Sequence, residues 1–263
     1  MAEFPIVEIK GVSKVFKLQD QTINALIDAN LSIAKGEFIC LIGASGCGKS
    51  TLLRIMAGFE QPTLSEALMW GKPIDGPDPG RGMVFQDYAL FPWLSVRDNI
   101  GFGPASRGLP KSEVKAIVDK FVELVGLQGF ASAYPHQLSG GMKQRVAIAR
   151  VLANDAELVL MDEPFGALDA MTRERLQDEL LEIWQRTGLT VVFVTHSIEE
   201  AIFLAGRVVV MTPAPGRIES DNAVTLARPR DVASPEFNAI RRVLGGKLHS
   251  HHGKVAYAPS AAV

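Results

Sequence analysis

The feature that most constrains this chain is a glycine-rich turn, Gly43-Ala44-Ser45-Gly46-Cys47-Gly48-Lys49-Ser50-Thr51. The apolar residues 38–42 before it predict a buried strand, and residues 52–57 after it predict a helix. Strand, G-x-x-x-x-G-K-[ST] turn and helix form the P-loop pattern, in which backbone N–H groups and a helix N-terminus surround phosphate oxygens. Lys49 is expected at the β- and γ-phosphates and Ser50 at Mg²⁺. A chance glycine-rich turn is the alternative, and the flanking elements argue against it.

Apolar runs and glycine or proline breaks divide the rest of the chain into parts. Residues 6–33 form two alternating runs, which predict an antiparallel meander with a possible interruption at Gly11. Residues 95–153 have helical spacing, most clearly at 111–125 and 139–153, and predict a separate lobe. From residue 155 to 212 short strands alternate with helices, which predicts a mostly parallel sheet with helices on its faces.

Composition excludes several classes of protein. The 263 residues are 47% hydrophobic with a net charge of −2, which gives no basic field for nucleic acid. Cys40 and Cys47 lie in a predicted strand and in the glycine-rich turn, so a reducing compartment without structural disulfides is expected. No run reaches 18 apolar residues and no signal-peptide pattern is present, so membrane association is expected only through a partner.

Polar side chains come directly after three of the apolar runs: Asp162 with Glu163, His196, and Gln86. Ligands of open α/β sheets bind beyond the carboxyl ends of the strands. Asp162 is therefore expected to hold Mg²⁺, Gln86 to coordinate it through the amide oxygen, and Glu163 to polarise the attacking water. His196 is expected to hydrogen-bond the γ-phosphate. Each residue alone fits an ordinary strand-end turn, but together with the P-loop they favour catalysis.

A second glycine-rich segment, Leu138-Ser139-Gly140-Gly141-Met142-Lys143-Gln144-Arg145, opens the helix predicted at 139–153. Ser139 is a good N-cap, and the two glycines expose first-turn N–H groups, which predicts a second anion site. One chain cannot easily bring both anion sites to one phosphate if they lie on separate lobes. Two copies in a head-to-tail pair can.

Together these motifs resemble the nucleotide-binding subunits of ATP-binding-cassette (ABC) transporters, over residues 6 to about 225. In the family's order they are the A-loop aromatic Phe16, Walker A at 43–51, Gln86, the signature at 138–142, Walker B at 158–163, the D-loop Ala167-Leu168-Asp169, and His196. The resemblance implies two copies with ATP between them, so that Ser139, Gly140 and Gly141 of one cap the γ-phosphate held by the other. It also implies that Phe16 stacks on adenine, with a core aromatic as the alternative, and that Asp169 crosses the interface.

A narrower resemblance, to cassettes of the nitrate/sulfonate/taurine importer group, rests on residues 86–96, 98–100 and 208–218 and on Met142. It implies membrane permease subunits that contact the region Gln86–Val96. The exposed aromatics Phe91 and Trp93 are expected there, with local packing in the lobe as the alternative. An external binding protein would supply a small anion such as nitrate, a sulfonate or taurine. The chain would lie on the cytoplasmic face of the inner membrane, held peripherally by the permease.

The expected fold class is α/β, a P-loop (RecA-like) and mostly parallel sheet with an N-terminal antiparallel β subdomain and an inserted helical subdomain. The ATPase domain is expected at 1–225 with the insertion at about 91–154, followed by a helix and loose tail at 226–263. The expected function is the ATPase of an importer. A soluble ABC ATPase uncoupled from transport would usually carry two cassettes or a long coiled coil. A P-loop kinase or GTPase would lack the signature helix.

Two departures from the family pattern bear on local geometry. Met142 stands where Gln is common and cannot complete a capping box with Ser139. Ser65 stands where Gly is common, at a cost on the order of 1 kcal/mol if the turn needs a positive φ. His249, His251 and His252 near the C-terminus fit a solvated tail better than a metal site, because no Cys or acidic ligand is close in sequence.

Overall fold

The computed structural model describes residues 5–18, 21–166 and 168–249. Its strands are β1 (Val7–Leu18), β2 (Gln21–Ile33), β3 (Phe38–Gly43), β4 (Leu64–Met69), β5 (Lys72–Pro73), β6 (Arg81–Val84), β7 (Leu158–Asp162), β8 (Thr190–Val194), β9 (Arg207–Met211) and β10 (Ile218–Ala223). Its helices are α1 (Lys49–Ala57), α2 (Val96–Ser106), α3 (Lys111–Leu124), α4 (Gly140–Leu152), α5 (Ala170–Thr187), α6 (Ile198–Leu204) and α7 (Pro235–His249). The predicted positions Asp20, Ala167, His251 and His252 lie outside the described residues.

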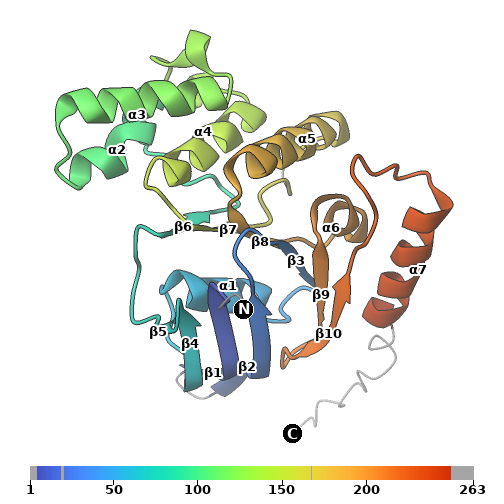
Figure 1. Ribbon diagram of the computed structural model, residues 1–263. Helices are drawn as coiled ribbons and strands as arrows, with labels where there is room; N and C mark the ends of the chain where they lie inside the picture. The colour runs from blue at the N-terminus through green and yellow to red at the C-terminus, as the bar shows by residue number, and fades with distance from the viewer. Residues whose placement is uncertain (1–4, 19–20, 167, 250–263) are drawn as a thin grey trace, which may run out of the picture.

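A six-stranded sheet in the order β10-β9-β3-β8-β7-β6 forms the centre of the molecule. All its neighbouring strands run parallel except β10, which is antiparallel to β9. A second sheet, β2-β1-β4-β5, is antiparallel. Figure 1 shows α1 between the two sheets and α4, α5 and α6 on the opposite face of the central sheet. The predicted α/β fold class is confirmed.

Alternation along the central strands explains this layering. Phe38, Cys40 and Ile42 of β3 belong to the apolar cluster shared with the helices α2 to α7. Ile39 and Leu41 belong to the cluster shared with α1 and the antiparallel sheet. Successive side chains of a strand point to opposite faces, so a continuous apolar run serves both layers.

The antiparallel sheet contains the irregularities that its glycine and serine positions predict. The register of β1 against β2 shifts between Ile9 and Val12, around Gly11, whose φ is 58°. The Gly11 N–H is held by the side chain of Asn30, at 2.8 Å. Ser65 has a φ of 66°, so the turn does use the backbone conformation that Gly adopts more easily.

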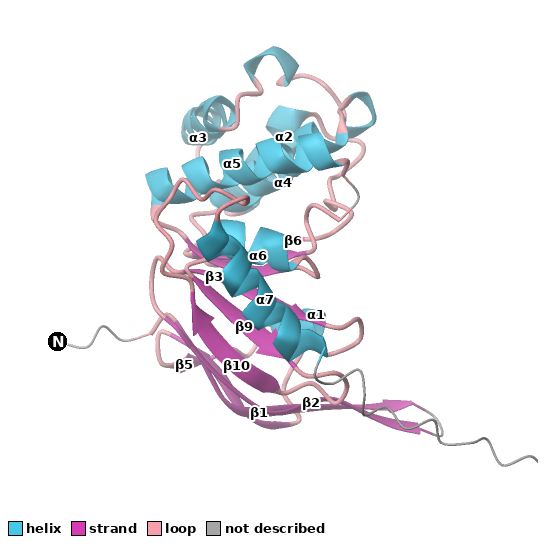
Figure 2. Cartoon of the chain, turned by 90° about the vertical axis from the view of Figure 1, so that its right-hand side faces the viewer, coloured by secondary structure: helices cyan, strands magenta, loops and turns pink. Residues whose placement is uncertain are grey.

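The helices α2, α3 and α4 gather at one end of the molecule, away from the antiparallel sheet (Figure 2). The buried face of α3 consists of Val118, Phe121 and Val122, three of the positions that the 3.6-residue period predicts. Ser139 caps α4, since its hydroxyl accepts from the Met142 N–H at 3.3 Å. The N-cap therefore forms without a Gln at Met142. The boundaries of the helical subdomain stay a prediction.

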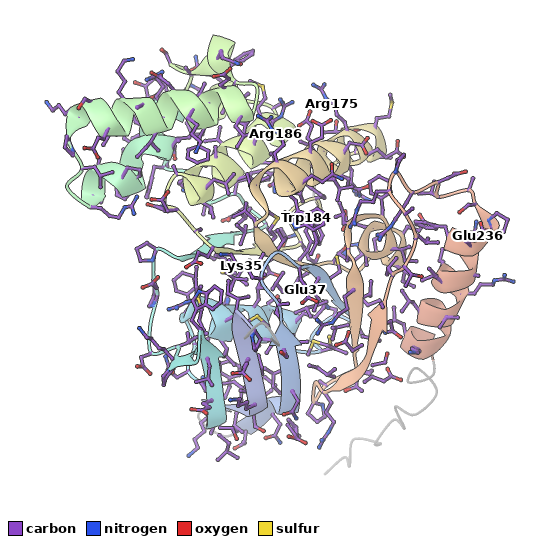
Figure 3. The ribbon with its side chains drawn as sticks, in the orientation of Figure 1. Lys35, Glu37, Arg175, Trp184, Arg186 and Glu236 are labelled. Carbon is purple, nitrogen blue, oxygen red and sulfur yellow. The ribbon has the colours of Figure 1, made fainter. Side chains whose placement is uncertain are left out.

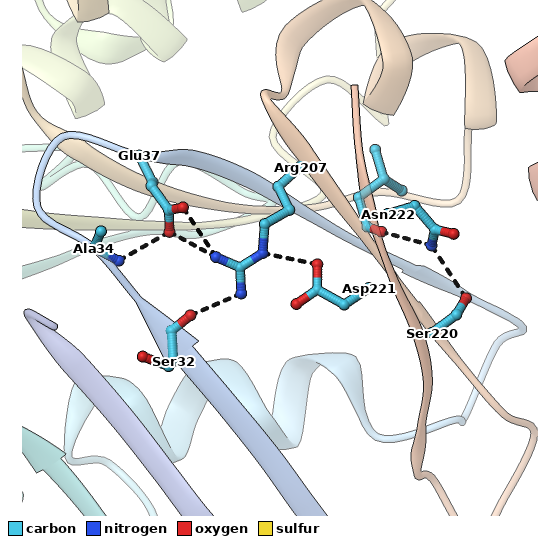
Figure 4. A network of polar contacts seen from close by, with 8 residues as sticks. Ser32, Ala34, Glu37, Arg207, Ser220, Asp221 and Asn222 are labelled. Atoms are coloured by element: carbon cyan, nitrogen blue, oxygen red, sulfur yellow. Dashed lines mark hydrogen bonds and ion pairs between the residues drawn. The ribbon is translucent and has the colours of Figure 1, made fainter. Parts of the chain in front are cut away.

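A polar network joins the two sheets behind β3. The guanidinium of Arg207 donates to Glu37 Oε2 at 2.8 Å, to Asp221 Oδ1 at 2.7 Å and to the Ser32 carbonyl at 2.7 Å (Figure 4). It thus links the turn after β2 to β9 and β10. Neither β10 nor this network is predicted by the apolar pattern, because β10 alternates half-buried and exposed residues.

Arg230, in the segment after β10, is hydrogen-bonded to the C-terminal end of α6. Arg230 is only 7% exposed. Its guanidinium donates to the carbonyls of Ile202 and Ala205 at the C-terminal end of that helix. Burial and the neighbouring Arg228 lower the pKa of Arg230 to about 10, so it stays charged at neutral pH. A cation at a helix C-terminus offsets the negative end of the helix dipole.

Among the described residues, no helix is both long and apolar enough to cross a membrane.

Candidate functional site

Four predicted site segments lie along one edge of the central sheet. The strands β3, β8, β7 and β6 are neighbours in that order and run parallel. Their carboxyl ends therefore meet on the same side, followed by the P-loop, His196, Asp162–Glu163 and Gln86 respectively. The topology brings together residues that are up to 153 positions apart in the sequence, from Gly43 to His196.

The P-loop is shaped by glycines in positions where a side chain would not fit. Gly48 has a φ of 90° and immediately precedes α1. A Cβ on Gly48 would lie 2.7 Å from the carbonyl oxygen of Ala25 on β2. A Cβ on Gly216, after β9, would lie 1.9 Å from the Cys47 carbonyl oxygen. The loop is thus held between two neighbouring segments, with its backbone free to wrap around an anion.

Lys49 is the buried cation of this loop, with 6% of its surface exposed. Its Nζ donates to the carbonyl oxygens of Gly43, at 2.9 Å, and Ala44, at 3.0 Å. Neutral carbonyls are weaker partners for an ammonium group than phosphate oxygens are. The loop and this lysine therefore fit a polyphosphate.

Ser50 and Asp162 form a pair at the start of α1 and the end of β7. The Ser50 hydroxyl donates to Asp162 Oδ1 at 2.9 Å. Burial raises the pKa of Asp162 and the charge of Glu163 adds to the increase, while the Ser50 hydrogen bond opposes it. A cation beside this carboxylate would favour its charged form. Two oxygen ligands this close fit Mg²⁺, which takes its remaining ligands from water and phosphate. Within the described ranges, no group of three or more His, Cys, Asp or Glu residues could hold a metal by itself.

Glu163 and His196 lie side by side beyond β7 and β8. Glu163 Oε2 is 3.2 Å from His196 Nδ1. Glu163 has a φ of 45°, and its N–H is fixed by the Val194 carbonyl at 3.0 Å. Non-glycine residues in this region cost about 1–3 kcal/mol and concentrate at functional sites. The His196 side chain remains 68% exposed, so it can reach a substrate in front of the sheet.

Gln86 and Phe16 are two further residues predicted for this site. Gln86 is exposed, and its Nε2 is 3.6 Å from where a Cβ of Gly166 would be, in the loop after Glu163. Phe16 is half-buried on β1 opposite Ile23, with Lys14 Nζ 4.9 Å from its ring centroid. It shares a sheet with the β2 residues that pack against Gly48. Its contact with adenine stays a prediction.

The signature residues belong to a different neighbourhood. Ser139 is exposed at the start of α4, and a Cβ on Gly140 would lie 2.9 Å from the side chain of Leu168. Asp169, next to Leu168, caps α5 by accepting from the Thr172 N–H at 3.0 Å. Hydrogen bonds from Thr172 lower the pKa of Asp169, so it is ionised at neutral pH. The capping role of Asp169 was missed by the sequence interpretation, although Asp before a helix is a recognised signal.

The segment from Gln86 to Val96 contributes one residue, Phe91, to the lining of a surface groove. The expectation of two exposed aromatics is wrong for Phe91, which is half-buried with its ring 4.5 Å from that of Phe102. Trp93 is 70% exposed, as expected. The groove is lined by Phe59, Pro77, Asp78, Pro79, Arg81, Gly82, Met83, Phe91, Phe102, Gly103, Arg150, Val151 and Asn154. Local packing therefore explains Phe91 and leaves Trp93 available.

Two polar residues fix this segment and were given no role from the sequence. Asn99 is fully buried and holds the Phe91 backbone through its side chain, accepting from the N–H at 2.9 Å. Arg150 on α4 donates to the carbonyls of Tyr88, at 3.1 Å, and Ala89, at 2.6 Å. Arg150 acts on residues more than 60 positions away in the sequence, so no local pattern marks it.

Comparison with known proteins agrees with this geometry. Residues 26–166 match the family described as ABC transporter. The chain is 49% identical to a taurine import ATP-binding protein of Roseobacter denitrificans, covering 83% of this chain and 82% of that one. It is 47% identical to an aliphatic sulfonates import ATP-binding protein of Bacillus cereus, with 90% and 93% covered. A dimeric ATP-binding cassette bound to ADP and Pi superposes with a TM-score of 0.72 at 33% identity, covering 84% of this chain and all of that one. The chain therefore belongs to the ABC transporter family, as an ATP-hydrolysing subunit.

Proposed function

We propose that this chain drives the import of a small anion, such as nitrate, a sulfonate or taurine, through a separate membrane permease. The names of relatives at 47–49% identity support import and this class of substrate. An external binding protein would deliver the anion to the permease. The chain itself would be a peripheral subunit on the cytoplasmic face of the inner membrane.

The observation that carries the proposal is the separation of the site residues into two groups. Lys49, Asp162, Glu163 and His196 gather at the carboxyl edge of the central sheet. Ser139 is exposed at the start of α4, and its neighbour Gly140 packs against Leu168. We infer that a complete site needs two copies, in which Ser139, Gly140 and Gly141 of one contact the γ-phosphate bound at Lys49 of the other. Asp169 would face the partner's P-loop. A dimeric structure of a related cassette supports this arrangement.

Within one copy, each group has a defined task in hydrolysis. The P-loop N–H groups and Lys49 bind the phosphates, and Phe16 stacks on the adenine. Ser50, Asp162 and Gln86 would hold Mg²⁺, which would neutralise charge on the phosphate oxygens. Glu163 orients and deprotonates the attacking water, and His196 holds the Glu163 carboxylate while facing the γ-phosphate. The fixed backbone of Glu163 supports this orientation.

The groove beside residues 86–96 is the proposed contact with the permease. Trp93 is exposed, with its ring centroid 5.7 Å from that of the groove residue Phe91, and an exposed tryptophan is a frequent anchor of protein interfaces. Gln86 begins the same segment. Movement of the segment could therefore carry the state of the nucleotide site to the membrane subunit.

This proposal predicts that Trp93→Ala weakens the attachment to the permease. We expect at least about a fivefold loss of the multi-spanning membrane protein that co-purifies with the tagged chain from membranes, because interface tryptophans commonly contribute more than 1 kcal/mol. Trp70→Ala is the matched control, since Trp70 is also exposed, at 40%, but lies at the end of β4. Equal recovery with both variants, at equal melting temperature, would place the contact elsewhere. Absence of any membrane partner for the wild-type chain would instead favour a soluble ATPase.

A further inference from the structure

A row of polar residues runs along α5 from its N-cap, and two of them approach the segment that carries His196. Asp169, Arg173 and Gln177 are four residues apart and so lie along one side of the helix. Asp169 caps the helix, and the other two reach out of it. Arg173 extends towards the start of α5 and Gln177 towards α6.

The guanidinium of Arg173 makes a hydrogen bond through Nη2, whereas its Nε has no partner among the described residues. Its Nη2 donates to the Leu168 carbonyl at 2.9 Å. Its Nε is buried and has no hydrogen-bond partner among the residues that the structure describes. A buried, unpaired N–H of a charged group costs free energy and calls for an explanation.

Glu200 is the acidic counterpart on α6. It is only 7% exposed, and its Oε1 accepts from Gln177 Nε2 at 3.0 Å. Burial raises the pKa of Glu200, while hydrogen bonds from the side chains of Thr195 and Gln177 and the charge of Arg173 oppose this increase. Thr195 directly precedes His196, so the Glu200 carboxylate is linked through Thr195 to the backbone of His196.

One small cavity is lined both by Arg173 and Glu200 and by the pair Glu163 and His196. Arg173 and Glu200 line it together with Glu163, Phe165, Gly166, Thr195, His196 and Ser197. The cavity lies behind the Glu163–His196 contact, between α5 and α6. Leu168, which Arg173 holds, packs at the other side against Gly140 of the signature segment.

We propose that Arg173 is a positioning residue for ATP hydrolysis, which joins the Leu168–Asp169 segment to Glu200 and through Thr195 to His196. The signature segment and Leu168 lie on the surface that the two-copy site needs, so docking of a second copy would press on the carbonyl that Arg173 holds. The Arg173 guanidinium, with one N–H still free, can then turn towards Glu200. This would align Glu163 and His196 only when the second copy is in place. The inference rests on the two-copy site proposed above.

The test compares two arginines of the same helix in the full-length chain. Arg173→Met should lower kcat about 10–100-fold, because small misplacements of reacting groups cost about that much. The Kd for ATP should stay within about threefold, since Arg173 lies behind the site. Arg175→Met is the control, because Arg175 is 71% exposed, pairs with Glu179 along the helix and points away from the sheet (Figure 3). Arg173→Lys keeps the positive charge and N–H donors but loses the planar guanidinium, and it should recover part of the lost rate.

A double-mutant cycle separates positioning from packing. Glu200→Gln keeps an acceptor for Gln177 but removes the charge, and it too should lower kcat. If Arg173 acts through Glu200, the double variant should be about as slow as the slower single variant. The proposal is overturned if Arg173→Met turns over as fast as Arg175→Met, if the two losses multiply, or if Arg173→Met and Arg173→Lys both fail to fold. If the wild-type rate per protomer does not depend on protein concentration, the two-copy site is contradicted, but Arg173→Met can still lower kcat. Failure of the two-copy site and failure of the role of Arg173 are therefore distinguishable.

Discussion

Glu163→Gln is expected to lower kcat for ATP hydrolysis about 100–1000-fold, the range typical of losing a general base. The amide keeps the shape of the side chain but cannot accept the proton of the attacking water. ATP should still bind, because Lys49 and the P-loop are unchanged. The rate is measured by phosphate release at saturating ATP, and the trapped ATP-bound dimer by size-exclusion chromatography.

The matched control for this variant lies at the other end of the same strand. Glu157 is exposed just before β7, so Glu157→Gln removes an equal charge far from the nucleotide edge of the sheet. We expect its rate to stay within about twofold of wild type, as surface substitutions usually have small effects. Near wild-type hydrolysis by Glu163→Gln would show that another group activates the water.

Lys49→Met is expected to weaken ATP binding at least about tenfold. A hydrogen bond to a charged group contributes about 1.5–3 kcal/mol, and Lys49 offers several to the phosphates. The methionine keeps most of the length and removes the charge. Equilibrium titration with a fluorescent ATP analogue measures the affinity directly, without requiring turnover.

Lys35→Met provides the comparison for this loss. Lys35 precedes β3, whereas Lys49 follows it. The Lys35 Nζ lies 5.7 Å from the centroid of the Trp70 ring, and Lys35 is labelled in Figure 3. Its replacement should leave the affinity for ATP unchanged. Tight binding by Lys49→Met would mean that the backbone N–H groups alone hold the triphosphate.

The nucleotide edge of the sheet could be predicted because its signals are local. The apolar runs before Gly43, Asp162 and His196 are continuous, as strands covered on both faces require. Once three such strands are parallel, their polar ends must meet. The helix α5 lies within the region where alternating strands and helices were predicted, since its period is regular and Gly188 ends it.

What the sequence does not reveal depends on contacts between distant elements. Strand β10 was not predicted because its sequence, Ile218-Glu219-Ser220-Asp221-Asn222-Ala223, is mostly polar and so resembles a loop. The burial of Phe91 depends on Phe102 and Arg150, which come from two different helices. Likewise, Arg173 and Glu200 are 27 residues apart and look like ordinary charged helix positions. Only the packing of α5 against α6 brings them to one cavity.

We propose that one chain holds only half of a hydrolytic site. The rate of ATP hydrolysis per protomer, measured at saturating ATP and Mg²⁺ across a wide range of protein concentration, tests this directly. We expect the rate per protomer to rise with concentration and to level off once pairs have formed. A rate per protomer that stays constant on dilution to concentrations at which the chain is monomeric would contradict it.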